Sequence, residues 1–262
     1  MSIWEAVLLG LVQGLTEFLP VSSSGHLVIA QALLGVDQPG LTFEVVVHFA
    51  TLLAVLVALK DDWYPIFLGL LGHPEHKEEG RRRFAALVAG SLPVALAGLL
   101  AREPIAALFA SPRVAAAMLL VTGAILWASE VVARKEPRAL ERLRLADAVL
   151  IGCGQALAVI PGISRSGSTL AAGLAVGLER QSAARFAFLL AIPAILGAAA
   201  LEVPELVQAG GVDWAPLAAG ALSAGVSGYA AIALFLRFLR SGSLKGFAVY
   251  TWAAGLVALA LV

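Results

Sequence analysis

The hydrophobic and polar positions divide this chain into long apolar runs separated by short polar segments. Six of the runs approach the length of a membrane-spanning helix, for which about 20 predominantly apolar residues are needed. They occupy residues 43–59, 84–100, 114–132, 186–201, 215–236 and 247–262. We expect each of these segments to form a transmembrane helix.

Two further apolar runs, 3–15 and 27–34, are too short to cross a membrane. The polar residues between them include Pro20 and Gly25. Pro20 lacks a backbone donor and disfavours helix at the residue before it. Non-helical backbone is tolerated at membrane depth where it is buried in protein or lines a watery cavity. The pattern therefore predicts a re-entrant hairpin of two short helices joined by a polar turn.

The same arrangement recurs later, where the polar segment 161–169 separates two short apolar runs. A displacement of 142 residues aligns identical residues of the two hairpins: Gly10 with Gly152, Gln13 with Gln155, Ser22 with Ser164, Ser24 with Ser166 and Gly25 with Gly167. We therefore interpret residues 1–262 as one membrane domain built from two repeats, 1–132 and 146–262. Each repeat holds a hairpin and three spans, and an odd number of spans inverts the second repeat relative to the first.

Composition agrees with this interpretation. The chain is 60% hydrophobic and 14% charged, against about 25% charged residues in soluble domains. The fold class we predict is an all-α integral membrane protein with about ten helices, six of them full spans. The formal net charge is zero, so no nucleic-acid partner is indicated. Cys153 is the single cysteine, which excludes an internal disulfide.

The basic residues are distributed unevenly between the loops. Fifteen of the eighteen Lys and Arg residues fall in 60–83, 133–146, 178–185 and 236–246, which share one side if both hairpins are re-entrant. Arg102 and Arg113 fall on the other side, and Arg165 lies inside the second hairpin. The positive-inside rule places the basic loops in the cytoplasm and both termini outside. The hairpins then enter from opposite faces, so their polar tips can meet near the midplane and form one site.

The polar side chains of the two tips are those that phosphoryl transfer requires. A charged group at the centre of a membrane helix costs about 2.5 kcal/mol or more, which makes such groups functional candidates. We expect Ser23 to attack phosphorus, His26 or Glu17 to take its proton, and Arg165 to bind phosphate oxygens. Backbone amides and hydroxyls at the start of a helix complete the predicted phosphate-binding set, which consists of Gly162, Ser164, Arg165, Ser166 and Thr169.

We also expect the tip of the first hairpin to bind a divalent cation. Glu17 can hold a cation that bridges diphosphate oxygens, with Gln13 one helical turn earlier on the same face. Alternatively, Gln13 hydrogen-bonds its repeat counterpart Gln155, and Arg165 only neutralises Glu17 as a buried ion pair. The hydroxyls of the second tip can likewise cap helices or bond to backbone carbonyls.

The sequence gives weaker indications of function for the three other histidines. His48 stands in an apolar span, where the repeat aligns it with Arg185, and is as compatible with a structural role as with a catalytic one. His73 and His76 lie in a charged segment and are expected to be solvated.

At these residues the sequence resembles the undecaprenyl-diphosphate phosphatase family, the bacitracin-resistance membrane enzymes of bacterial cell-wall lipid recycling. The family's Glu/Gln-x-x-x-Glu motif is matched by Gln13 and Glu17, which lead into the segment 22–26. Its Pro-Gly-x-Ser-Arg-Ser-x-x-Thr motif is matched in full by residues 161–169. The resemblance covers the whole length of the chain.

The resemblance implies removal of the terminal phosphate from undecaprenyl diphosphate in the bacterial inner membrane. It also implies a divalent cation, Mg²⁺ or Ca²⁺, and a site that opens to the outer face. The catalytic set it implies is Glu17, Ser23, His26 and Arg165. Gln13 stands in a permitted variant of its position, which weakens any mechanism that needs two carboxylate ligands. The motif leaves open whether Ser23 or His26 is the nucleophile, and we predict Ser23.

Two other classes of membrane protein share parts of this pattern. Type 2 phosphatidic-acid phosphatases share short Ser-Gly-His and Ser-Arg segments, but they need a later histidine, and none follows His76. An inverted-repeat lipid-phosphate transporter or flippase has the same architecture. A serine beside a histidine and an arginine exceeds what recognition requires, which favours the phosphatase. Small residues such as Gly220 permit close helix packing within one protomer or in a homodimer.

Overall fold

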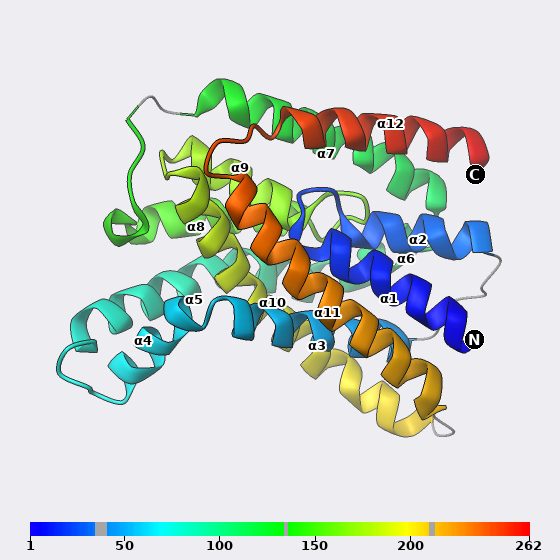
Figure 1. Ribbon diagram of the computed structural model, residues 1–262, viewed down its shortest axis with the longest axis horizontal. Helices are drawn as coiled ribbons and strands as arrows, with labels where there is room; N and C mark the ends of the chain where they lie inside the picture. The colour runs from blue at the N-terminus through cyan, green and yellow to red at the C-terminus, as the bar shows by residue number, and fades with distance from the viewer. Residues whose placement is uncertain (35–40, 134–135, 210–212) are drawn as a thin grey trace.

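The structure is a computed structural model that describes residues 1–34, 41–133, 136–209 and 213–262. Its elements are helical, and no strand occurs in these residues apart from one bridge pairing of Arg138 with Leu178, which confirms an all-α protein (Figure 1). In chain order the helices are α1 (Ile3–Phe18), α2 (Ser23–Leu34), α3 (Leu41–Ala58), α4 (Lys60–Leu70), α5 (Lys77–Leu100), α6 (Arg102–Phe109), α7 (Pro112–Val132), a 3-10 turn (Leu140–Arg142), α8 (Leu145–Leu157), α9 (Arg165–Ala175), α10 (Arg180–Ala209), α11 (Trp214–Phe238) and α12 (Lys245–Leu261).

The first predicted hairpin is formed by α1 and α2. The Ser2 side chain accepts a hydrogen bond from the Glu5 amide, and the Glu5 carboxylate accepts one from the Ser2 amide, so a capping box begins α1. The helix ends before Leu19, which is extended because Pro20 follows it. Ser22 adopts a left-handed backbone angle, with φ of 71°, and α2 begins at the next residue.

The second predicted hairpin is formed by α8 and α9. Gly162 lies in its turn with φ of 93°, and a Cβ there would come 2.2 Å from the Ala115 carbonyl oxygen. Only glycine fits this position. The Gly162 carbonyl accepts a hydrogen bond from Thr122 Oγ1 at 2.8 Å, and Ser164 caps α9 by accepting one from the Gly167 amide at 3.0 Å.

The tips of the two hairpins are in contact, as the sequence predicts (Figure 1). A Cβ on Gly25 would lie 2.9 Å from the Cα of Gly162. Ser166 Oγ donates a hydrogen bond of 2.8 Å to the backbone carbonyl of Leu19. Polar segments that are far apart in the sequence therefore form one continuous region.

Each hairpin packs closely against a long helix of the other half. α1 lies beside α11, and a Cβ on Gly10 would come 2.3 Å from the Gly220 carbonyl oxygen (Figure 1). α8 packs against α5 in the same way, because a Cβ on Gly152 would come 2.1 Å from the Gly90 carbonyl oxygen. Gly10 and Gly152 are counterparts in the predicted repeat. The two halves are thus interlocked.

The predicted spans coincide with α3, α5, α7, α10, α11 and α12. By length and composition α5, α7, α10 and α11 can cross a membrane, and α3 with α4 makes a fifth if the pair counts as one span broken by an angle of 84°. α12 is apolar but shorter, with 17 residues. The chain is a multi-pass membrane protein.

Two segments that connect predicted spans are helical. The charged segment 60–83 contains α4, and the connection 101–113 contains α6, so the described residues hold twelve α-helices rather than about ten. Tertiary contacts stabilise α4 despite its charges and its internal proline. Trp63 Nε1 donates to the Leu56 carbonyl at 2.7 Å, and Asp62 accepts two hydrogen bonds from Arg185 of α10.

The two termini lie at the same end of the molecule, and the α4–α5 turn lies at the opposite end (Figure 1). This arrangement agrees with the predicted separation of basic loops from termini. Arg134 and Lys135, which we assigned to one of the basic loops, lie outside the described residues.

Candidate active site

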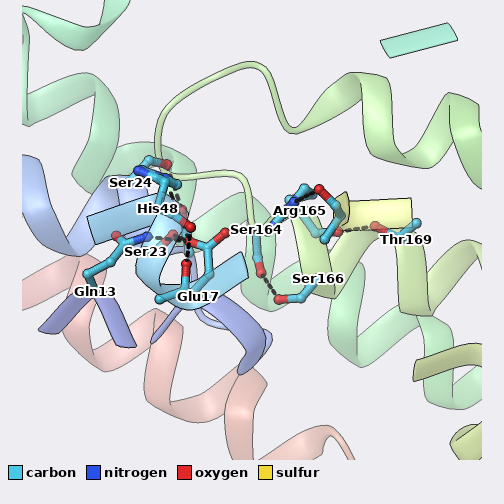
Figure 2. Close-up of polar contacts among 12 residues, drawn as sticks. Gln13, Glu17, Ser23, Ser24, His48, Ser164, Arg165, Ser166 and Thr169 are labelled. Atoms are coloured by element: carbon cyan, nitrogen blue, oxygen red, sulfur yellow. Dashed lines mark hydrogen bonds and ion pairs between the residues drawn. The ribbon is translucent and has the colours of Figure 1, made fainter. Parts of the chain in front are cut away.

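Glu17 lies at the centre of a cluster of polar side chains from both hairpins (Figure 2). Only 4% of its side chain is exposed. One carboxylate oxygen accepts hydrogen bonds from Ser23 Oγ at 2.5 Å and from Gln13 Nε2 at 2.8 Å. The other oxygen forms an ion pair with Arg165. Four of the residues predicted from the sequence are therefore in direct contact.

Local structure explains how these groups converge. Gln13 and Glu17 are one turn apart near the end of α1, so they share a face. Ser23 and Arg165 occupy equivalent positions, since each is the first residue of the second helix of its hairpin. The equivalence stops there, because the repeat counterpart of Glu17 is the apolar residue Val159. The site is therefore a single asymmetric one, with its acid supplied by the first hairpin.

His48 of α3 also belongs to this cluster. Its Nε2 lies 3.8 Å from a carboxylate oxygen of Glu17 (Figure 2). Its Nδ1 lies 2.8 Å from the Glu44 carbonyl. A carbonyl only accepts hydrogen bonds, so Nδ1 carries a hydrogen and Nε2 faces Glu17. The sequence left the role of His48 undecided. The sequence feature that could have indicated a functional role for His48 is an imidazole inside an otherwise apolar span.

His26 lies one turn after Ser23, but its ring makes other contacts. Nδ1 is 2.8 Å from the Ser22 carbonyl, and Nε2 is 2.9 Å from the hydroxyl of Tyr250 on α12. The two rings stack with centroids 5.7 Å apart. No hydrogen bond joins His26 to Ser23 or Glu17 within the described residues. A catalytic role for His26 stays a prediction. The sequence did not indicate that Tyr250 contacts the hairpin, because Tyr250 belongs to no recognisable motif.

The hydroxyls of the predicted phosphate-binding set have partners within the protein. Ser164 caps α9, and Ser166 donates to the Leu19 carbonyl of the other hairpin. Thr169 donates to the Arg165 carbonyl (Figure 2). These are the structural roles that we gave as alternatives for them. Phosphate binding by these hydroxyls and by Gly162 stays a prediction.

The donor set near Glu17 fits a hard divalent cation. Gln13 Oε1 is buried and lacks a hydrogen-bond partner in the described part of the chain. The alternative hydrogen bond between Gln13 and Gln155 is not formed, because both amide atoms of Gln155 are also without partners there. An amide oxygen and a carboxylate are ligand types that Mg²⁺ and Ca²⁺ take, and the hydrogen bond from Gln13 Nε2 to Glu17 would have to break for both side chains to hold one ion.

Known proteins match this chain over nearly its whole length. The family described as bacitracin resistance protein BacA matches residues 6–257. An undecaprenyl-diphosphatase of Gemmatimonas aurantiaca is 41% identical, with 99% of this chain and 98% of the relative covered. Undecaprenyl-diphosphatases of Halothermothrix orenii and Carboxydothermus hydrogenoformans are 39% and 40% identical, each with 100% of this chain and 98% of the relative covered.

Proposed function

Because this chain belongs to the family of the bacitracin resistance protein BacA, we propose that it is a membrane phosphatase that hydrolyses undecaprenyl diphosphate. The products are undecaprenyl phosphate and inorganic phosphate. One observation of the structure supports this proposal for the residues of this chain. Ser23 and Arg165, from different hairpins, both contact the buried carboxylate of Glu17.

The Ser23–Glu17 hydrogen bond supports a nucleophilic mechanism. Ser23 Oγ already donates to Glu17 at 2.5 Å, so Glu17 is placed to act as the base. As Oγ bonds to the terminal phosphorus, its proton passes to Glu17, and the bond from that phosphorus to the bridging oxygen breaks. Undecaprenyl phosphate leaves with the electron pair of that bond, and Ser23 is phosphorylated.

Water completes the reaction. Glu17 first releases its proton to solvent, and water then attacks the phosphorus of phosphorylated Ser23. One hydrogen of the water stays on inorganic phosphate and the other returns to Ser23 Oγ. The side chains then have their starting protonation states, so the cycle balances.

Arg165 and the predicted cation supply positive charge. The guanidinium of Arg165 stabilises negative charge on the phosphoryl oxygens, and its planar donors suit them. Glu17 neutralises Arg165 in the structure, so a diphosphate brings more negative charge than this pair can balance. Gln13 and Glu17 would hold a divalent cation, which supplies the missing positive charge when bound.

The proposed orientation follows from the charges. The basic loops face the cytoplasm of a bacterial inner membrane, and both termini lie outside. An opening of the site to the outer face is what the resemblance to the family implies. The common end of the two termini supports this topology (Figure 1).

Release of inorganic phosphate by purified protein in detergent tests the function. We expect release from undecaprenyl diphosphate and none from undecaprenyl phosphate, which lacks the anhydride bond. Glu17→Ala and Arg165→Ala should each slow release by about a hundredfold or more, because each removes a base or a stabilising charge. Wild-type rates in both variants would contradict the catalytic assignment.

The transporter or flippase alternative is tested with the same protein reconstituted in lipid vesicles. Such a protein would move a lipid phosphate between the leaflets of vesicles without releasing phosphate. Lipid movement without phosphate release would replace the proposed function.

A further inference from the structure

The turn between α4 and α5 gathers three side chains that bind metals, at the end of the molecule opposite the termini (Figure 1). We propose that His73, Glu75 and His76 form a second metal site, for a borderline divalent ion of which Zn²⁺ is the best match. The ligand atoms of the three side chains lie within 4.8 Å of one another. Ligand atoms around tetrahedral zinc lie about 3.4 Å apart, given bonds of about 2.1 Å. The ligand atoms would have to approach one another by up to about 1.4 Å to share one ion.

The backbone of this turn is ordered by its own hydrogen bonds. The His73 amide donates to the Leu68 carbonyl at 3.0 Å, and the His76 amide donates to the His73 carbonyl at 3.1 Å. The two imidazole rings lie with their centroids 5.5 Å apart. Gly72 precedes them with φ of 85°, a backbone angle that favours glycine.

Close packing of α4 against α5 fixes the two ends of the turn. A Cβ on Gly69 would come 2.4 Å from the His76 carbonyl oxygen and 2.8 Å from the Cα of Gly80. The helices therefore approach as closely as their backbones allow. Because the turn is already formed, a metal ion would order only the three side chains, which lowers the entropic cost of binding.

The ligands decide which ions the turn prefers. Two imidazoles with one carboxylate suit zinc and similar transition metals, whereas Mg²⁺ and Ca²⁺ prefer oxygen ligands alone. This distinguishes the turn from the oxygen donors Gln13 and Glu17 of the candidate active site. His73 and Glu75 are exposed and His76 is half-buried, so an ion has a direct path from solvent. In the described residues none of the three side chains is engaged in an ion pair.

Titration of the detergent-purified chain with Co²⁺ tests the site, because the visible absorption of Co²⁺ reports its ligands. The protein should carry an affinity tag without histidines, and excess Mg²⁺ should be present to fill oxygen-only sites. We expect one equivalent of Co²⁺ to bind with a visible band and to be displaced by Zn²⁺. A second expected readout is a rise in the temperature of thermal unfolding with added Zn²⁺.

Substitutions in the turn identify the ligands. His73→Ala combined with His76→Ala should abolish the band, and Glu75→Gln should weaken Co²⁺ binding by about tenfold or more. Glu78→Gln is the matched control, because it removes a nearby exposed carboxylate outside the cluster and should bind as the wild type does. The proposal is wrong if the wild type shows no band, if the double variant binds normally, or if Glu75→Gln and Glu78→Gln behave alike. These readouts follow the metal itself and are independent of phosphatase activity.

Discussion

The carboxylate of Glu17 is surrounded by donors from three segments of the chain. Gln13 comes from its own helix, Ser23 from the next, and Arg165 from the other hairpin. A buried carboxylate is tolerated only when it is paired and hydrogen-bonded. These contacts therefore stabilise the charge of Glu17. They also place Ser23, the proposed nucleophile, and Arg165, the proposed phosphate-binding side chain, beside it.

Removing either of the two imidazoles near the site should lower the rate of phosphate release by different amounts. Ser23→Ala should lower kcat/KM for phosphate release by about a thousandfold or more, because it removes the nucleophile. His48→Ala should cost more than His26→Ala, because the ring of His48 faces Glu17 whereas that of His26 binds Tyr250. Rates are measured in detergent beside the thermal unfolding of each variant. A larger loss from His26→Ala, at unchanged stability, would assign the working imidazole to His26 instead.

The sequence could predict some of these residues and not others. Polar segments that interrupt the apolar runs contain Glu17, Ser23 and Arg165. Burying such polar or charged side chains in a membrane costs free energy, so the sequence alone marks them as functional candidates. His48 and Tyr250 reach the hairpins through tertiary contacts, His48 with Glu17 and Tyr250 with His26. The imidazole inside an apolar span was a local sign for His48, whereas Tyr250 left no local pattern in the sequence.

At the scale of elements, the hairpins were predictable and α4 was not. Pro20 and the glycines of the tips mark the breaks between short helices directly. α4 begins with Lys60, Asp61 and Asp62, a composition typical of a loop. Its helix depends on the contact of Asp62 with Arg185, which lies far away in the sequence.

Close glycine contacts should make helix packing sensitive to a single methyl group. Gly10→Ala would place a Cβ 2.3 Å from the Gly220 carbonyl oxygen and force α1 away from α11. Overpacking of this kind costs about 1–3 kcal/mol, so the unfolding temperature should fall by roughly 5 °C. Thermal unfolding in detergent, followed by tryptophan fluorescence, measures the change.

Gly98→Ala is the matched control for this prediction. A Cβ on Gly98 has no neighbour within 4 Å, and alanine is the better helix former. Its unfolding temperature should stay the same or rise slightly. Equal decreases in the two variants would show that helix packing at Gly10 is not the cause.

At the scale of the whole molecule, the charge distribution predicts which end faces the cytoplasm. Glu79→Cys in the α4–α5 region and Glu103→Cys in α6 place exposed thiols at sites that we assign to opposite sides. Cys153, the native cysteine, is replaced by serine in both variants. A membrane-impermeant maleimide should label only Glu103→Cys in intact cells and both after permeabilisation. Labelling of both in intact cells would contradict the inverted topology.

The shared placement of Ser23 and Arg165 has a consequence for the ancestry of the chain. In a pair of identical halves, both positions would hold the same residue, so a hydroxyl and a guanidinium could not face Glu17 together. If the predicted repeat arose by duplication, joining the two copies in one gene would have allowed those positions to diverge. The interlocked packing of each hairpin on the opposite half would then have kept both residues in one protein.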